Sequence, residues 1–365
     1  MMKQRVGIIT FHQADNLGAV LQAYALQQAL EQFTACDAQI IDYRCAGISN
    51  GLGSMKRLSI KQKSKALFLR MYYLLKHRHF EKFRKSQLVL SAGTYTSESV
   101  GACAEDYDIF ISGSDQVWNL ECSGWDDAYF LDFVPDNKRR YSYAASLGSY
   151  RFKPEEQEHI GELLKRFRRI SVREESAARE IAALGRKDAV VHPDPVMLLT
   201  AEQWRPVMSK RLIKDKYIFV YLIQQDVNVM REARAYARKH NCRIINNKKS
   251  PEFILHGAPG DFLSWIYNAE CVFTNSFHGT AFSVLFNKPL AADIQLADGR
   301  SNNRVKELLE QVRAENCIIG HESFNYGPAH GQESIAAMRN GGRSYLDEII
   351  SDPGKNKHKG ITCNA

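Results

Sequence analysis

The sequence lacks the short motifs that mark many cofactor-dependent α/β enzymes. No Gly-x-Gly-x-x-Gly follows a predicted strand, no phosphate-binding P-loop occurs, and no group of His, Cys, Asp or Glu residues has metal-ligand spacing. These absences argue against a dehydrogenase and an NTPase. We therefore expect neither a metal ion nor a separate cofactor.

The chain also lacks a long apolar run and any Cys-x-x-Cys pair. No run approaches the roughly 20 residues that cross a bilayer, and residues 1–15 contain no apolar stretch of the kind found in a signal peptide. The eight cysteines are scattered, which favours reduced thiols. We expect a cytoplasmic protein that is soluble or peripheral at the inner face of the membrane.

What the chain does contain is enough apolar residues for a large core. Of 365 residues, 44% are hydrophobic and 10% aromatic, so the length suits two domains. The net charge of +8 favours acidic partners such as phosphates, nucleic acid or an anionic membrane surface. Charge alone does not choose among them.

The stretch 271–286 predicts a strand, a polar loop and a helix in that order. Cys271–Thr274 is apolar and β-forming, and helix-forming residues run from Thr280 to Phe286. In an open α/β sheet such a loop lies at the edge where ligands collect, and the next helix points its positive end there. We therefore expect His278 and Ser276 to face an anion.

The amino-terminal residues predict a βαβ unit. Val6–Thr10 reads as a buried strand, residues 18–30 as a helix capped by Asn16, and residues 40–43 as the next strand. Gly18 allows a close backbone approach to a ligand or to the strand. A tight turn without a ligand is the alternative.

Residues 56–85 form a strongly basic stretch. They contain eleven Lys and Arg residues against the single acid Glu81, interleaved with aromatic and aliphatic residues. A basic amphipathic helix suits an anionic membrane surface, while a solvated helix packing its apolar stripe on the domain is the alternative. Nucleic-acid binding is a less favoured third hypothesis because no recognisable nucleic-acid-binding motif accompanies the charge. We expect no nucleic-acid partner.

Two further strand ends carry polar residues. Asp115, Gln116 and Trp118 follow an apolar strand, where a carboxylate and an amide can bind sugar hydroxyls or act as a base; ordinary turn chemistry is the alternative. Arg173 ends the predicted strand 170–173, which places it on the ligand rim unless it pairs with a neighbouring glutamate.

Two prolines after residue 191 mark an exit from the first domain. Strands and helices then alternate again. We predict an α/β fold of two Rossmann-like domains facing a central cleft, with residues 1–198 forming the first domain, 199–350 the second, and 351–365 a frayed tail.

Several short motifs together resemble the polysaccharide pyruvyl transferase family, and their order matches over about residues 5–315. They are Phe11-His12, Asn16-Leu-Gly-Ala, Leu21-Gln-Ala-Tyr-Ala-Leu26, Gly113-Ser-Asp-Gln-Val-Trp-Asn119, Ser142-Tyr-Ala-Ala-Ser-Leu-Gly148, Ser171-Val-Arg-Glu174, Asp194-Pro-Val196 and Ser276-Phe-His-Gly279. The resemblance implies a fold like that of the two-Rossmann glycosyltransferases. It also implies transfer of a pyruvyl group from phosphoenolpyruvate to two sugar hydroxyls in cell-surface polysaccharide biosynthesis, giving a cyclic ketal and phosphate.

The resemblance suggests roles for residues of both domains. His278 is the candidate acid and Asp115 the candidate base, although Asp115 could equally bind the acceptor. The expected donor-binding residues are Arg173, Ser276, Gly279 and Arg304, and the second domain is the expected donor side. The expected residues for a glycan acceptor, lipid-linked in one version of the hypothesis, are His12, Asn16, Gln116 and Trp118.

One position departs from the family pattern. Several members carry Arg-Leu-His where this chain has Ser276-Phe-His278, so one donor-binding arginine is missing. Arg304, Lys248 or Lys249 would supply the charge, or the donor differs. A glycosyltransferase with a nucleotide-sugar donor and a noncatalytic glycan-binding protein are the alternative functions.

Overall fold

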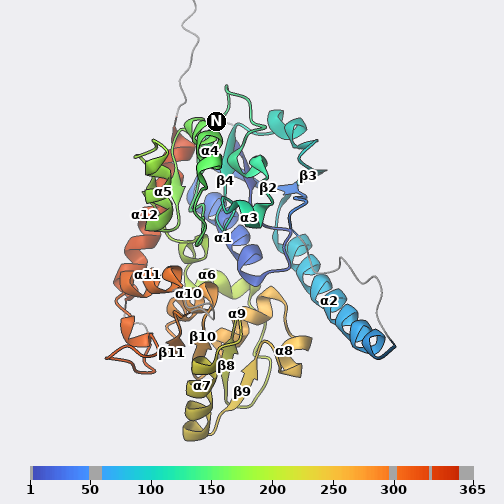
Figure 1. Ribbon diagram of the computed structural model, residues 1–365, viewed down its shortest axis with the longest axis vertical. Coiled ribbons are helices and arrows are strands. Elements are labelled where there is room, and N and C mark those ends of the chain that lie inside the picture. The colour runs from blue at the N-terminus through green and yellow to red at the C-terminus, as the bar shows by residue number, and fades with distance from the viewer. Residues whose placement is uncertain (1–2, 49–59, 296–301, 329–330, 353–365) are drawn as a thin grey trace, which may run out of the picture.

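The computed structural model describes residues 3–48, 60–295, 302–328 and 331–352, and contains two parallel sheets surrounded by helices (Figure 1). The first sheet has the strand order β3-β2-β1-β4-β5. Its strands are β1 (Gln4–Ile9), β2 (Cys36–Tyr43), β3 (Leu90–Tyr95), β4 (Ile109–Ser112) and β5 (Arg139–Ser142). β1 pairs with both β2 and β4, so the strand order reverses beside β1. A ligand crevice is expected at the carboxyl ends of these two strands.

The second sheet has four parallel strands in the order β11-β10-β8-β9. They are β8 (Tyr217–Tyr221), β9 (Arg243–Asn246), β10 (Val272–Thr274) and β11 (Leu290–Ala292). This order reverses beside β8, where β10 is the other neighbour. The predicted fold of two Rossmann-like units is confirmed.

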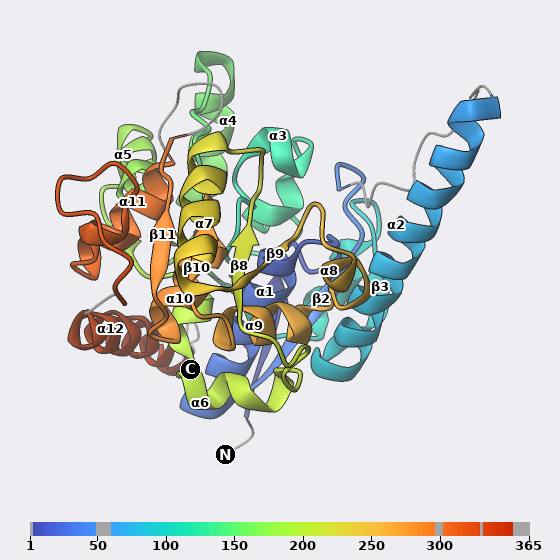
Figure 2. The ribbon, with the colours of Figure 1, turned by 90° about the horizontal axis from the view of Figure 1, so that it is seen from below.

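Helices cover the faces of both sheets (Figures 1 and 2). Those of the first part of the chain are α1 (Leu17–Phe33), α2 (Ile60–Gln87), α3 (Leu120–Ser123), α4 (Pro154–Lys165) and α5 (Glu175–Ala183). Those of the second part are α6 (Ala201–Trp204), α7 (Val227–His240), α8 (Pro251–Leu255), α9 (Pro259–Tyr267), α10 (Phe277–Leu285), α11 (Asn303–Gln311) and α12 (Gln332–Ser351). A short pair, β6 (Ser171–Val172) and β7 (Val190–Val191), continues the first sheet past β5 through isolated bridges.

One hydrophobic cluster joins the two units. Trp204, in the connection between them, is fully buried and packs its ring against Tyr24 of α1 and Phe282 of α10. Its indole nitrogen donates to the Val196 carbonyl at 3.2 Å. The buried aromatic contact fixes how the loops of one sheet face those of the other.

The last described helix returns to the first unit. Tyr345 of α12 donates a hydrogen bond to the Ser142 carbonyl at 3.0 Å, and Glu348 accepts one from Arg169 at 2.6 Å. The predicted boundary at residue 350 did not anticipate this packing, which depends on contacts between residues far apart in the chain. The predicted frayed tail lies outside the described residues from position 353 onward.

Helix α2 projects from the body of the molecule (Figures 1 and 2). Its carboxyl-terminal half is anchored by the buried rings of Phe80 and Phe83 and by Arg84, whose guanidinium pairs with Asp15 at 2.9 Å. The expected helix is confirmed, and this half packs its apolar stripe on the domain. No helix in the described part of the chain is long and apolar enough to cross a membrane.

Candidate active site

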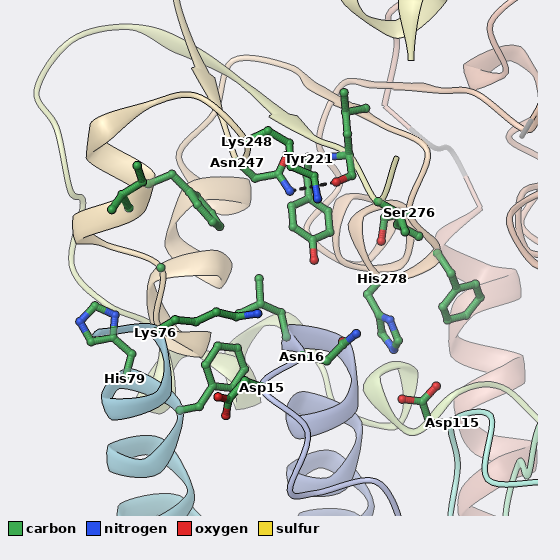
Figure 3. Close-up of a pocket in the computed structure, with 18 of the residues that line it drawn as sticks. Asp15, Asn16, Lys76, His79, Asp115, Tyr221, Asn247, Lys248, Ser276 and His278 are labelled. Carbon is green, nitrogen blue, oxygen red and sulfur yellow. Dashed lines mark hydrogen bonds between the residues drawn. The ribbon is translucent and has the colours of Figure 1, made fainter. Parts of the chain in front are cut away.

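A cavity of about 380 Å³ lies where the carboxyl-terminal loops of the two sheets meet (Figure 3). The first unit contributes Asp15, Asn16, Leu17, Asp115 and Gln116. The second contributes Tyr221, Lys248, Ser276, His278 and Arg304, among others. Helix α2 adds Tyr72, Lys76, His79 and Phe80. The predicted cleft is present, and its wall comes from strand-end loops and from several helices.

His278 stands in the first turn of α10. The prediction began this helix at Thr280, but it begins at Phe277 because Ser276 caps it: the Ser276 hydroxyl accepts from the amide of Gly279 at 3.3 Å. The capped turn brings the imidazole to the boundary between the units. Its Nε2 lies 3.6 Å from Asp194 Oδ2, and neither ring nitrogen makes a hydrogen bond with any described residue.

The imidazole also presses on the start of α1. A Cβ added to Gly18 would lie 2.0 Å from His278 Nδ1, so only glycine leaves room for the ring. The close approach expected at Gly18 is therefore an approach to a side chain of the second unit. The Nε2 atom therefore faces Asp194, and the Nδ1 atom faces the start of α1.

Asp194 is a buried carboxylate next to His278 that makes several hydrogen bonds. Its carboxylate accepts from Arg173 Nη1 at 2.6 Å, from Ser114 at 3.4 Å and from the Val196 amide at 3.1 Å. Burial would raise the pKa of the carboxyl, but His278, Arg173 and the amide outweigh it and hold the pKa well below its ordinary value. An ionised Asp194 fixes the orientation of His278.

Asp115 forms the cavity wall on the first-unit side. Its backbone is left-handed, with φ at 73°, and its carbonyl accepts from the amides of Val117 and Ser146 at 2.7 and 3.0 Å. A strained non-glycine residue that is held by its neighbours is often functional. The turn projects the Asp115 carboxylate into the same cavity as His278 (Figure 3).

Arg304, at the start of α11, supplies positive charge to this end of the cavity. Burial and the nearby Arg173 lower its pKa, and it forms no ion pair with any described acid. A half-buried guanidinium without a carboxylate partner suits an anionic ligand.

Comparison with known proteins agrees with these features. The family model for polysaccharide pyruvyl transferase matches residues 16–292, which include His278, Asp194 and Asp115. The chain belongs to the polysaccharide pyruvyl transferase family. No curated protein sequence matched the chain.

Solved structures resemble this transferase in fold only. A UDP-GlcNAc 2-epimerase from Methanocaldococcus jannaschii is 13% identical, covers 93% of this chain and 99% of its own, and has a TM-score of 0.48. The ADP-heptose lipopolysaccharide heptosyltransferase II of E. coli is 9% identical over 93% of this chain and 99% of its own, with a TM-score of 0.38. Such distant likeness does not bear on the substrate.

The structure corrects the expectation for Arg173. Its guanidinium is buried, paired with Asp194 and 3.6 Å from Glu174, and does not line the main cavity of the transferase. The alternative of an ion pair with a neighbouring glutamate describes it better. Arg173 is a positioning residue that holds Asp194, and through it His278.

Three other expected contacts are also placed differently. His12 is fully buried, with Nε2 3.1 Å from Asp42, and Trp118 is fully buried, donating to the Tyr129 carbonyl at 3.0 Å. Neither reaches the cavity, so neither contacts an acceptor there. The backbone of Gly279 packs against Thr274, and a Cβ added to Gly279 would lie 2.5 Å from the threonine hydroxyl. Gly279 therefore allows α10 to pack closely on β10.

Asn16 and Gln116 do line the cavity as expected. The Asn16 Oδ1 caps α1 by accepting from the amides of Gly18 and Ala19 at 2.9 and 3.2 Å, and its amide nitrogen makes no hydrogen bond with described residues. Of the three cations suggested to replace the missing arginine, Arg304 and Lys248 line the cavity and Lys249 does not.

Sequence reasoning missed the contribution of α2. Tyr72, Lys76 and His79 project from it into the transferase cavity. Their spacing, on one helical face at i, i+4 and i+7, was a signal of a shared face, but nothing local showed what that face would meet. Asp194 was part of a quoted motif and was not assigned a role. Among the described residues, no group of three or more His, Cys, Asp or Glu is arranged to hold a metal ion.

Proposed function

We propose that this transferase joins the enolpyruvyl unit of phosphoenolpyruvate to two hydroxyls of a glycan sugar, in cell-surface polysaccharide biosynthesis and with no separate cofactor. The observation that supports the proposal is that one cavity contains both positive charge for an anionic donor and a side chain that can transfer a proton. Arg304 and the amino terminus of α10 supply positive potential. His278 stands in the first turn of α10, and the carboxylate of Asp115 lines the same cavity.

The chemistry needs few groups. A proton goes to the methylene carbon of phosphoenolpyruvate, a sugar hydroxyl adds to the neighbouring carbon and loses its proton, and a second hydroxyl displaces the phosphate and loses its own. The product is a cyclic ketal with a new methyl group. His278 is the proposed proton donor at carbon and Asp115 the proposed base for a hydroxyl.

The acceptor would lie on the first-unit side. The Asn16 amide and Gln116 provide hydrogen-bond donors beside Asp115, and the aromatic rings of Tyr72 and Tyr221 provide flat apolar surface in the same cavity. This mixture of polar and aromatic lining suits a sugar ring.

Donor binding tests the assignment. Titration calorimetry with phosphoenolpyruvate should show binding that Arg304→Gln weakens roughly tenfold to a hundredfold, because a hydrogen-bonded charge contributes about 1.5–3 kcal/mol. The matched control is Lys306→Gln, an exposed cation on the same helix, which should bind normally. Binding of a nucleoside diphosphate in place of phosphoenolpyruvate would instead support a glycosyltransferase.

We also propose that the enzyme works at the cytoplasmic face of a membrane, held there by α2. The outward face of its described half is cationic with two exposed apolar side chains, Met71 at 63% and Leu74 at 43% exposure. The exposed residues are Arg70, Met71, Leu74, Arg78, Lys82 and Lys85. Such a stripe suits anionic headgroups, each cation contributing about 1 kcal/mol. The side chains of residues 56–69, also part of the predicted basic segment, lie outside the described ones.

Vesicle sedimentation tests the membrane contact. The protein should pellet with phosphatidylglycerol-containing vesicles and stay in solution with pure phosphatidylcholine. The test variant reverses three charges, Arg70→Glu, Arg78→Glu and Lys82→Glu, and should lose pelleting. A matched control reverses three exposed cations on α7, Arg234→Glu, Arg238→Glu and Lys239→Glu. Equal loss in both variants would contradict a specific role of α2.

A further inference from the structure

A second concentration of positive charge lies at the α2 end of the cavity, away from Arg304. Lys76 of α2 and Lys248, just after β9, both line the cavity (Figure 3). The charges that act on Lys76 are those of Asp15 and Lys248, whereas those acting on Arg304 are Arg173, Glu174, Asp115 and Asp194. Arg304 also lines a smaller cavity together with Arg173 and Glu174, and neither Lys76 nor Lys248 lines that cavity.

Lys76 has no carboxylate of its own. It makes no hydrogen bond or ion pair with any described residue, and its Nζ lies 5.6 Å from the centroid of the Phe80 ring. The nearby Asp15 is already engaged, because Oδ1 accepts from Arg84 and Oδ2 contacts His77, each at 2.9 Å.

The surroundings of the Lys76 ammonium disfavour its charged form when no ligand is bound. Burial lowers its pKa, Asp15 opposes this, and Lys248 lowers it further. A helix that only packed on the domain would lose nothing by placing an apolar residue there. Lys76 is half-buried and Lys248 is exposed, and both line one cavity. Two cations on one cavity favour binding of a multiply charged anion.

We propose that Lys76 and Lys248 bind a phosphate or diphosphate group carried by the acceptor, so that the acceptor is a glycosyl phosphate ester. This inference rests on the proposed function. Tyr221 and Asn16 lie between Lys76 and His278 (Figure 3), where the sugar ring would sit with its hydroxyls toward His278. The same chemistry is found in lipid-linked and nucleotide-linked sugars.

Inorganic diphosphate is the probe for this subsite. Its binding is measured by titration calorimetry with phosphoenolpyruvate saturating, and again in Arg304→Gln, so that the donor end does not contribute. We expect binding that Lys76→Ala and Lys248→Ala each weaken tenfold or more, with phosphoenolpyruvate affinity unchanged. Lys249→Ala, which removes an adjacent exposed cation outside the cavity, is the matched control and should bind diphosphate normally.

The possible outcomes separate the two proposals. Diphosphate binding that is unchanged in Lys76→Ala, or a loss of phosphoenolpyruvate affinity in that variant, overturns the subsite. Diphosphate binding at Lys76 without any phosphoenolpyruvate binding supports the subsite and overturns the donor assignment. Farnesyl diphosphate and UDP are then compared as competitors: tighter binding of the first assigns a lipid carrier, and tighter binding of the second a nucleotide carrier.

Discussion

Replacing His278 with asparagine should lower kcat by roughly 10²–10⁴, the usual contribution of a positioned general acid, while the protein stays folded. Asparagine keeps the polarity and approximate size of the side chain but cannot deliver a proton at neutral pH. Steady-state kinetics with phosphoenolpyruvate, together with a circular dichroism spectrum and a melting curve, measure both parts. Full activity in a folded His278→Asn variant would remove His278 from the mechanism.

Gly18→Ala should give the same loss without changing the histidine. The added methyl group occupies the position of the His278 ring, so the imidazole must turn away from Asp194. Alanine is favoured over glycine in a helix by about 1 kcal/mol, and the fold should keep its stability. Gly341→Ala in α12 is the control, because nothing lies within 4 Å of the added atom, and it should leave activity unchanged.

Replacing Arg173 with alanine should destabilise the protein by about 3–5 kcal/mol, because it leaves a buried carboxylate uncompensated. The side chains of Arg173 and Asp194 are exposed by only 2% and 0%, so water cannot replace the lost partner. Urea denaturation followed by tryptophan fluorescence gives the change. The guanidinium holds Asp194 and does not line the cavity. In the fraction of the variant that stays folded, we therefore expect a large decrease in kcat and only a small increase in the KM for phosphoenolpyruvate.

An exposed arginine provides the comparison. Arg243 pairs with Asp215 at 2.6 Å, with both side chains about half exposed, and Arg243→Ala should cost less than about 1 kcal/mol. Equal midpoints for the two variants would show that Asp194 does not depend on Arg173. A rise in KM with kcat unchanged would restore Arg173 as a donor-binding residue.

The parts of the site that the sequence predicted are those set by neighbouring residues. A strand, a polar loop and a helix at 271–286 placed His278 at the carboxyl edge of a sheet, and Asn16 was recognisable as a cap. Both follow from patterns within one turn or one strand. The position of Asp115 followed because parallel strand ends share an edge.

The parts that the sequence could not predict depend on pairs of distant residues. Arg173 directly follows β6, and Asp194 lies in the loop after β7. Only the packing of these two residues shows that the arginine charge is used inside the protein. His12 was expected to contact the acceptor because of the family resemblance, yet its partner Asp42 lies at the end of β2. The sequence spacing shows that Lys76 shares one face of α2 with other residues. That this face borders the cavity depends on the tertiary structure.

The most direct test of the account is turnover itself. The purified enzyme is incubated with phosphoenolpyruvate and a panel of glycosyl diphosphates and simple glycosides, and released phosphate is measured together with the NMR signal of a ketal methyl group. The account predicts that both appear in equal amounts with at least one acceptor, and that neither appears with His278→Asn. Sugar transfer from a nucleotide sugar, with no ketal formed from phosphoenolpyruvate on any acceptor, would contradict it.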